Sequence, residues 1–359
     1  MYSYIFKYFN LYKIMYCKTI KLNNNISKNI IVSKNYNKLI KKENQYYYFK
    51  LSNNKNKINN HIKYWNFYKF KLNPYEYIFN KHLSISKILP VSRSYFKLLE
   101  LLTDNNILFK YNDVLCLAEA PGGFIQLLND KLIAKNIIGN TLNFTSNKIP
   151  SWNKKIEKNN VNLLKGSGDL TDINYLRNVL FKLNKFDLIT CDGGIDYSSN
   201  YNDQEINSHK LIYSEIYVSL KLLKPNGNLI LKVFDMFYNN TIHLLYILYC
   251  SFDKIIISKP FTSRPSNSEK YIICINYNLN YNNNIIKLLE TNFKTKNINL
   301  KIPDEFYNEI KNINENYIIN QIKMINNIIE NIKEKQIINN EKNYKHCHEW
   351  CEKYKIPTN

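Results

Sequence analysis

Four charged residues stand at or beside the ends of predicted secondary-structure elements in the middle of the chain. Asp192 follows the apolar run LITC, and Glu269 precedes the apolar run KYIIC. Lys232 interrupts the apolar run LILKVF, and Lys97 lies off the apolar stripe of a predicted helix. Charged side chains are rarely buried without partners. A lysine on an exposed edge strand explains one of them, but four that reach one face of one sheet indicate a site.

Two lysines and two carboxylates at close range suit a reaction in which a hydroxyl group becomes a nucleophile. A ribose 2′-hydroxyl has a pKa far above neutrality, so its attack on a methyl sulfonium requires removal of its proton and stabilisation of the oxyanion. We expect Lys97 to lower the pKa of Lys232 by like-charge repulsion. We expect Asp192 and Glu269 to orient the two ammonium groups, and a lysine with a pKa near neutrality is a competent base.

A glycine-containing turn follows the predicted strand at 113–118 and consists of Glu119, Ala120, Pro121, Gly122, Gly123 and Phe124. In a doubly wound sheet, ligands bind beyond the carboxyl ends of the strands. Two adjacent glycines let the backbone approach a ligand closely. The turn is neither G-x-G-x-x-G nor a Walker A loop, so it does not predict a pyrophosphate cradle. Taken alone, it is also consistent with a plain turn.

Strands and helices alternate around these residues. Ser92 is a plausible N-cap for a helix with Tyr95, Leu98, Leu99 and Leu102 at helical spacing. The alternation predicts an α/β fold, a doubly wound and mostly parallel sheet covered on both faces, with the last two strands as an antiparallel edge pair. Strands are predicted at 113–118, 135–142, 186–194 with Asp-Gly-Gly at its end, 228–234, 254–258 and 270–277. Helices are predicted after the 119–124 turn, at 205–223 before a Lys-Pro-Asn-Gly stop signal, and at 241–250.

The composition divides the chain into a biased Asn/Lys/Tyr-rich extension at 1–84, a central domain at 85–280 and a helical segment at 281–359. The extension is either poorly ordered or a basic, Tyr-rich module that contacts RNA. Near the end, His346, Cys347, His348 and Cys351 suggest zinc, but no second ligand pair stands at zinc-finger spacing. We expect no metal there, and instead a terminal helix that packs Trp350 and Tyr354.

The net charge of +21 indicates a polyanionic partner, although an AT-rich coding sequence also favours Lys, Asn, Ile and Tyr. The scattered cysteines form no disulfide framework and predict a reducing, intracellular compartment, cytoplasm or nucleus, or a virion or host cytoplasm for a viral protein. No apolar run is long enough to predict a membrane span. Arginine occurs only at 93, 177 and 264, which draws attention to Arg93 and Arg264 as phosphate ligands beside the four charged residues.

Five motifs in order resemble those of the FtsJ-like ribose 2′-O-methyltransferases: SRSYFKLLE, LCLAEAPGGF, LITCDGGIDY, LILKVFDMF and KPFTSRPSNSEKYIIC. The Lys-Asp-Lys-Glu tetrad of that family corresponds to the four charged residues above. The finer match, which includes Gln204-Glu205, is to cap-specific mRNA enzymes of the cap-2 type and of large DNA viruses. The resemblance covers about 85–280.

The resemblance implies a class I, Rossmann-like methyltransferase fold with S-adenosylmethionine bound at Glu119–Phe124 and Asp169 beside the adenine. One departure is Thr141, which stands where many class I enzymes have an acidic residue that holds the cofactor ribose. The implied substrate is RNA, most closely the 5′-capped end of mRNA. Ribosomal RNA methylation and a non-catalytic RNA-binding subunit stay open as alternatives, as do a capping-apparatus partner and the oligomeric state.

Overall fold

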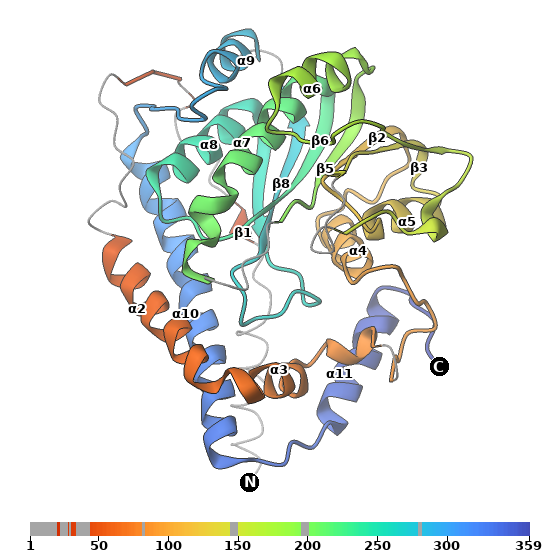
Figure 1. Ribbon diagram of the computed structural model, residues 1–359, viewed down its shortest axis with the longest axis vertical. Coiled ribbons are helices and arrows are strands. Elements are labelled where there is room, and N and C mark those ends of the chain that lie inside the picture. Colours follow the sequence, from red (N-terminus) through yellow and green to blue (C-terminus); the bar gives the residue numbers. More distant parts are fainter. Residues whose placement is uncertain are drawn as a thin grey trace.

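An eight-stranded sheet forms the centre of the computed structural model, which describes residues 20–21, 28, 30–33, 44–80, 83–143, 150–194, 201–278 and 282–359. Within these residues the strand order is β1-β7-β8-β6-β5-β2-β3-β4 (Figure 1). The strands are β1 (Ile20–Lys21), β2 (Tyr111–Leu117), β3 (Ala134–Gly139), β4 (Val161–Leu163), β5 (Phe186–Cys191), β6 (Leu223–Val233), β7 (Phe252–Ser258) and β8 (Lys270–Tyr277).

The neighbours from β4 to β6 are parallel, so the carboxyl ends of these strands meet at one edge of the sheet. β8 runs antiparallel between β6 and β7. The predicted antiparallel pair is therefore present, with β8 inside the sheet rather than at its edge. Beyond β7, the edge is taken by β1, which also runs antiparallel. The return of β8 brings its first residues beside the carboxyl end of β6.

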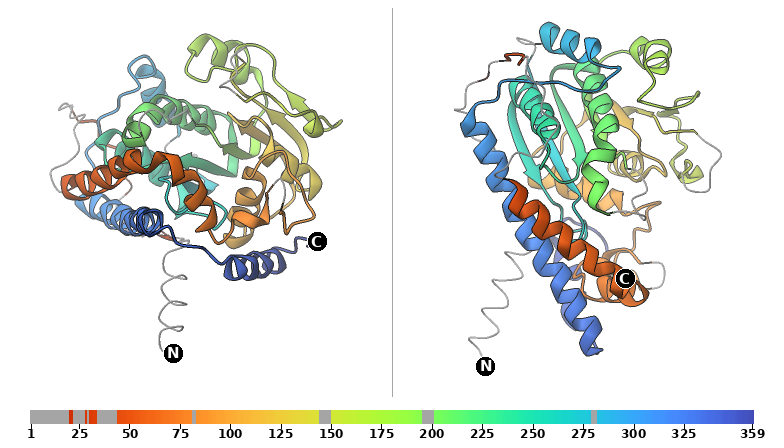
Figure 2. Two further views of the ribbon diagram at one scale, coloured as in Figure 1. Left: turned by 60° about the horizontal axis from the view of Figure 1, so that its bottom comes forward. Right: turned by 60° about the vertical axis from the view of Figure 1, so that its left-hand side comes forward.

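Helices cover both faces of the sheet, as the alternating elements predict (Figures 1 and 2). Side chains on the strands alternate between two cores. In β2, for example, Leu115 and Leu117 belong to one core while Val114 and Cys116 belong to the other. The helices of the first core are α6 (Ile173–Asn178), α7 (Gln204–Leu222), α8 (Asn239–Ser251), α9 (Asn282–Thr291) and the first half of α10 (Asp304–Glu334). Those of the second are α4 (Ser94–Asp104), α5 (Gly123–Asp130) and α11 (Glu341–Lys353).

A third core joins the two flanking segments of the chain. Leu51, Ile58 and Trp65 pack with the isoleucines of α10 (Asp304–Glu334), and the two segments lie side by side in both views of Figure 2. The described part of the N-terminal segment, 44–80, is therefore folded and packed. Its elements are α2 (Gln45–Lys57), a 3₁₀ turn η2 (Ile58–His61), α3 (Ile62–Lys71) and a second 3₁₀ turn η3 (Glu76–Ile78).

Local details differ from the sequence expectations at three places. The N-cap of α4 is Arg93, and Ser92 Oγ instead accepts the backbone N–H of Ser94 at 3.3 Å. α7 ends at Leu222, just before the predicted stop signal, but β6 begins directly after it at Leu223 rather than at residue 228, and its register with β5 shifts between Leu223 and Asn228. β4 and α6 were not predicted. Among the described helices, none has the length and apolar character of a membrane span.

Candidate active site

Lys97, Asp192, Lys232 and Glu269 meet at the edge where the carboxyl ends of the parallel strands lie. Asp192 directly follows β5, and Lys232 is the penultimate residue of the neighbouring β6. Glu269 precedes the antiparallel β8. Lys97 comes from the first turns of α4 and reaches Glu269, with Nζ 2.8 Å from Oε1 and 2.9 Å from Oε2. The structure thus brings all four sequence-predicted residues together.

Asp192 and Lys232 form the second pair of the tetrad. Lys232 Nζ lies 3.2 Å from Asp192 Oδ1 and donates a hydrogen bond of 2.6 Å to the carbonyl oxygen of Asp192. The hydroxyl of Tyr271 donates to the same Oδ1 at 2.8 Å. Tyr271 is paired with Lys232 across β6 and β8, so it holds the carboxylate from the other side. Sequence reasoning missed Tyr271, whose signal is its place in the register opposite the buried lysine.

The charge states differ from the sequence expectation. Burial lowers the pKa of Lys232, but the carboxylates of Asp192 and Glu269 raise it more, and the net pKa lies above its ordinary value. The expected depression of this pKa by Lys97 is therefore wrong, because the carboxylates of Asp192 and Glu269 determine its direction. Burial raises the pKa of Glu269, yet Lys97 and Lys232 outweigh it and hold the pKa well below its usual range. The resting tetrad consists of two ion pairs.

Glu269 is further fixed by the loop that precedes it. The hydroxyl of Ser263 donates to Oε1 of Glu269 at 2.7 Å, and Lys259 Nζ donates to its carbonyl oxygen at 2.7 Å. Glu100 on α4 holds the same loop, since it accepts the N–H groups of residues 261 and 262 at 2.6 and 2.8 Å. Burial raises the pKa of Glu100 to about 7, against the hydrogen bonds from Thr262. The loop thus ties α4 to β8 on either side of the Lys97–Glu269 pair.

The turn at Glu119–Phe124 lies at the carboxyl end of β2, next to β5, and contains Ala120 and Pro121. Oε1 of Glu119 accepts the N–H of Phe124 at 2.7 Å and so caps the start of α5. Its Oε2 is buried without a hydrogen-bond partner. Burial and the nearby Asp192 raise the pKa of Glu119 well above its usual range. An acceptor is therefore available at the position where the sequence predicts a ligand.

The two positions of the turn require glycine for different physical reasons. Gly122 has a φ of +107°, a left-handed conformation that favours glycine. Gly123 lies at the first position of α5, where an added Cβ would overlap the hydroxyl oxygens of Ser92 and Ser94. The close approach at Gly123 is thus to the start of α4. The sequence argument assigned it to a ligand.

Glu215 on α7 is a second buried carboxyl group at this edge, and the sequence analysis did not identify it. Its Oε1 has no hydrogen-bond partner, and an added Cβ on Gly193 would overlap that atom. Burial raises the pKa of Glu215 to about 8, against the effect of Lys232. In the sequence, the signal that could have identified Glu215 is a glutamate within the apolar stripe of the predicted 205–223 helix. The buried carboxyl oxygens Glu119 Oε2 and Glu215 Oε1 fit a ligand that carries hydrogen-bonding groups, as S-adenosylmethionine does.

Asp169 and Thr141 lie at the carboxyl ends of the two outer strands. Asp169 follows β4, and its Oδ1 accepts the N–H and the hydroxyl of Thr171 at 2.8 and 2.7 Å. An added Cβ on Gly168 would overlap the carbonyl oxygen of Thr141, so the loop before Asp169 packs directly on the end of β3. The two residues are therefore neighbours of the 119–124 turn along the same edge. Their contacts to a cofactor stay predictions.

Arg93 and Arg264 are engaged inside the protein by Glu76 of η3. Glu76 Oε1 lies 2.5 Å from a guanidinium nitrogen of each arginine, and Oε2 accepts Nε of Arg264 at 3.0 Å. The side chain of Arg93 is 19% exposed and that of Arg264 38%. The arginines form a cluster beside the tetrad rather than free phosphate ligands. Arg264 is the more exposed of the two, and the role of both arginines as phosphate ligands stays a prediction.

The two C-terminal cysteines are packed inside the protein. Cys347 and Cys351 are buried, and Cys347 Sγ donates to the carbonyl oxygen of Pro74 at 3.0 Å. Trp350 and Tyr354 are buried against the second core, as predicted. Groups of three or more His, Cys, Asp or Glu suited to a metal ion are not found within the described residues.

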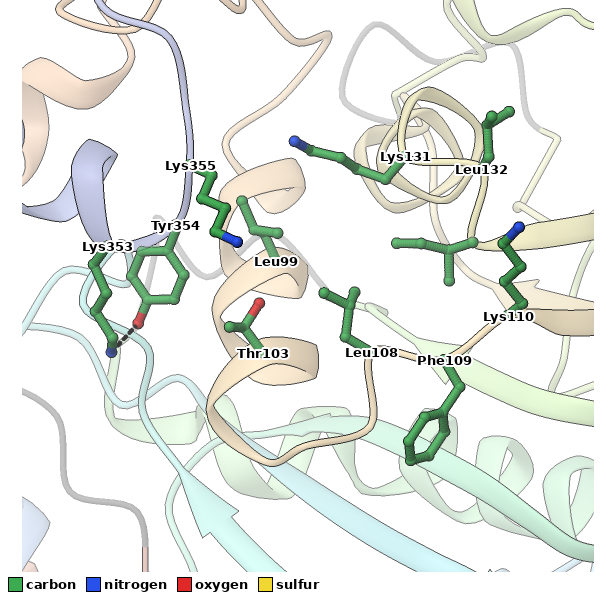
Figure 3. A pocket seen from close by; sticks show the side chains of 11 residues that line it. Leu99, Thr103, Leu108, Phe109, Lys110, Lys131, Leu132, Lys353, Tyr354 and Lys355 are labelled. Carbon is green, nitrogen blue, oxygen red and sulfur yellow. Dashed lines mark hydrogen bonds between the residues drawn. The ribbon is translucent and has the colours of Figure 1, made fainter.

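A pocket of about 380 Å³ lies away from the tetrad, at the amino ends of β2 and β3 (Figure 3). Lys110, Lys131 and Lys355 surround it together with the exposed apolar side chains of Phe109 and Leu132. These residues belong to the edge of the sheet opposite the candidate active site. They provide surface controls for the experiments below.

Comparison with known proteins agrees with this geometry. A family model described as FtsJ-like methyltransferase matches residues 90–277, more than half of the chain. This range contains the whole tetrad, the 119–124 turn and β2 to β8. The chain therefore belongs to the FtsJ-like methyltransferase family, which confirms the resemblance seen in the sequence motifs.

Curated relatives match parts of this domain. A cap-specific mRNA (nucleoside-2′-O-)-methyltransferase of Autographa californica nuclear polyhedrosis virus is 39% identical over 148 residues, which cover 40% of this chain and 56% of that protein. Mouse cap-specific mRNA (nucleoside-2′-O-)-methyltransferase 1 is 31% identical over 182 residues, 45% of this chain and 22% of the mouse protein. The match thus spans about half, or less, of the length of these relatives.

A solved structure, described as that of a ribosomal RNA methyltransferase from Plasmodium falciparum, superposes with a TM-score of 0.41. It is 22% identical in sequence, and the superposition covers 52% of this chain and 97% of that one.

Proposed function

We propose that the chain transfers a methyl group from S-adenosylmethionine to a ribose 2′-hydroxyl of RNA, at the 5′-capped end of mRNA. The observation that carries the proposal is the meeting of two Lys–carboxylate pairs at the carboxyl edge of the sheet, beside the 119–124 turn. The names of the viral and mouse relatives support mRNA caps as the substrate class. The complete tetrad argues against a non-catalytic RNA-binding subunit.

S-adenosylmethionine, when bound, supplies an electrophilic methyl group on a sulfonium, and Glu119, Glu215 and Asp169 are the residues proposed to hold it. The chain supplies the means to prepare the hydroxyl. Lys232, charged in the resting structure, donates hydrogen bonds and stabilises negative charge on the ribose oxygen. As a base, Lys232 must first lose a proton, so the rate is expected to rise with pH.

Each other tetrad member has a positioning role in the proposal. Asp192 fixes the Nζ of Lys232 and is itself fixed by Tyr271. Glu269 neutralises Lys97 and adds to the field that keeps Lys232 charged. These contacts hold the tetrad in position and so reduce the rearrangement that is needed at the moment of reaction.

The test is transfer of a tritiated methyl group to capped mRNA, the same RNA without a cap, and ribosomal RNA, with the modified nucleotide mapped. The proposal expects label on a 2′-hydroxyl near the cap and much less on uncapped RNA. Label on ribosomal RNA alone would move the substrate to the alternative class. Absence of label from every RNA, with S-adenosylmethionine binding intact, would contradict the proposed activity.

A further inference from the structure

The helices α2 and α3 have two different faces. One face packs Leu51, Ile58 and Trp65 into the core shared with α10. The other face carries aromatic rings in solvent, although Asn or Lys, both abundant in this chain, would fill exposed positions without exposing apolar surface. The exposed fractions are 64% for Tyr46, 58% for Phe49, 50% for Tyr64 and 57% for Phe67.

Lysine side chains accompany these rings. Lys50 Nζ lies 5.4 Å from the ring centre of Tyr46, Lys63 Nζ lies 5.3 Å from that of Tyr64, and Lys71 Nζ lies 5.9 Å from that of Phe67. The sequence from 45 to 71 contains no Asp or Glu. The two helices themselves therefore offer aromatic planes and positive charge and contribute no carboxylate. Surfaces that bind single-stranded nucleic acid combine these two properties, since bases stack on the rings and phosphates meet the lysines.

Two sets of contacts connect this aromatic-lysine face to the candidate active site. Lys55 of α2 reaches Asp235, just beyond β6, at 3.0 Å, and Ser268, next to Glu269, also at 3.0 Å. At the other end, Lys71 Nζ lies 3.5 Å from the hydroxyl of Tyr77, the residue after Glu76. The helices are thus attached to the catalytic edge of the sheet and to the cluster of Glu76 with its arginines. Figure 1 shows them running below the sheet, alongside α10.

We propose that the exposed face of α2 and α3 binds single-stranded RNA, namely the nucleotides that follow the one held at the tetrad. The surface is defined by Tyr46, Phe49, Lys50, Lys63, Tyr64, Phe67 and Lys71. This inference rests on the proposed function for the identity of the substrate. It adds the surface that holds the rest of the strand, and it gives the basic, Tyr-rich stretch of the sequence a definite role. Charge selects RNA over an apolar protein segment, because uncompensated lysines surround the rings.

The experiment uses the full chain and two variant sets with matched controls. The aromatic set replaces Tyr46, Phe49, Tyr64 and Phe67 by Ala, and its control replaces the exposed Phe109 and Leu132 by Ala. The lysine set replaces Lys50, Lys63 and Lys71 by Gln, and its control replaces Lys110, Lys131 and Lys355 by Gln, with the same change of charge. Fluorescence anisotropy measures affinity for a capped single-stranded RNA long enough to cover both helices and for a capped trinucleotide. Thermal unfolding of each variant checks that it is folded.

The aromatic set is expected to bind the long RNA at least about tenfold more weakly and to bind the trinucleotide unchanged. The slope of log affinity against log salt concentration is roughly 0.7 per phosphate contact, so the loss of three lysines is expected to reduce this slope for the long RNA by about 2. Replacing Tyr46 and Tyr64 by Phe keeps the stacking surface and is expected to keep the affinity. Wild-type affinity in both sets, or equal losses in the controls, would overturn the proposal.

The two proposals fail separately. If the wild-type chain methylates capped RNA and both variant sets bind the long RNA normally, the proposed RNA-binding surface is wrong and the proposed function stands. If both variant sets bind the long RNA more weakly but the wild-type chain methylates no RNA, the proposed surface stands and the proposed function is wrong. Equal losses for the trinucleotide and the long RNA would show that the substitutions disturb the site itself, which also overturns the proposed surface.

Discussion

Two guanidinium nitrogens of Arg264 donate hydrogen bonds to the carboxylate of Glu76, although the two residues are 188 positions apart in the chain. Arg93 binds the same carboxylate. The pair joins η3 of the N-terminal segment to the loop before β8. Through that loop, the packing of the flanking helices is connected to the position of Glu269.

Replacing Glu76 by Gln is expected to destabilise the protein in a pH-dependent way. Burial raises the pKa of Glu76, but Arg264 and Arg93 lower it to about 2, below the ordinary 4.5. The stabilisation is therefore present above pH 4.5 and is lost as the pH falls toward 2. Urea unfolding at neutral pH should show a loss of about 3 kcal/mol for Glu76→Gln, shrinking in acid.

Glu349→Gln is the control for this experiment, because Glu349 is 52% exposed and its ion pair with Lys345 lies at the surface. Its effect on the free energy of unfolding should be close to zero at every pH. A Glu76→Gln protein as stable as the wild type at neutral pH would mean that the cluster contributes no net stability.

Lys232→Ala is expected to lower the rate of methyl transfer at least about 10²-fold and to leave S-adenosylmethionine affinity within a few fold. Single-turnover transfer and calorimetry measure the two quantities. Lys224→Ala in the same strand is the control, since Lys224 pairs with Asp113 and Asp187 at the far end of β6. Retention of more than a tenth of wild-type activity would remove Lys232 from the mechanism.

The pH dependence of the rate tests the charge state of Lys232. Because its pKa is raised in the resting structure, the single-turnover rate should still rise with pH above neutrality if Lys232 is the base. Asp192→Asn removes the carboxylate that raises this pKa most, and should shift the rising limb to lower pH. A flat profile in both proteins would contradict a base role for Lys232 and leave it as an electrostatic group.

Gly123→Ala is expected to destabilise the protein by about 1–3 kcal/mol, because the added methyl group meets Ser92 and Ser94 at the start of α4. Removing the two hydroxyl groups with Ser92→Ala and Ser94→Ala should reduce the cost of the alanine at 123. A double-mutant cycle by urea unfolding measures this coupling. Absence of coupling, together with lost S-adenosylmethionine affinity, would favour the original interpretation that Gly123 faces the ligand.

Much of the central domain was predictable because its hydrophobic pattern is local. The stripe of Tyr95, Leu98, Leu99 and Leu102 is buried as its spacing predicts. The tetrad was predictable because charged residues at strand ends stand out in apolar runs. Tyr271 and Glu215 were missed because their roles depend on strand register and on packing across the sheet, which a single sequence does not display.

The flanking segments were harder to interpret for a compositional reason. Residues 45–71 repeat Tyr, Phe, Asn and Lys so densely that no apolar stripe separates from the background. The partner that gives Trp65 its buried position is α10, far along the chain. Likewise, the pairing of both arginines with Glu76 joins segments that nothing in the local sequence connects. Long-range packing therefore decides what the composition leaves ambiguous.

The core shared by α2, α3 and α10 has a consequence for synthesis on the ribosome. Leu51, Ile58 and Trp65 are made early, while their partners on α10 are made after the whole sheet domain. Until then these apolar groups lack their native partners on α10, a situation that exposes a nascent chain to aggregation and to chaperones. The α2–α3 contacts with α10 can therefore form only after α10 has been synthesised. Ribosome-bound chains that stop before residue 304 would contain the sheet domain together with α2 and α3 but would lack α10, which packs on these two helices.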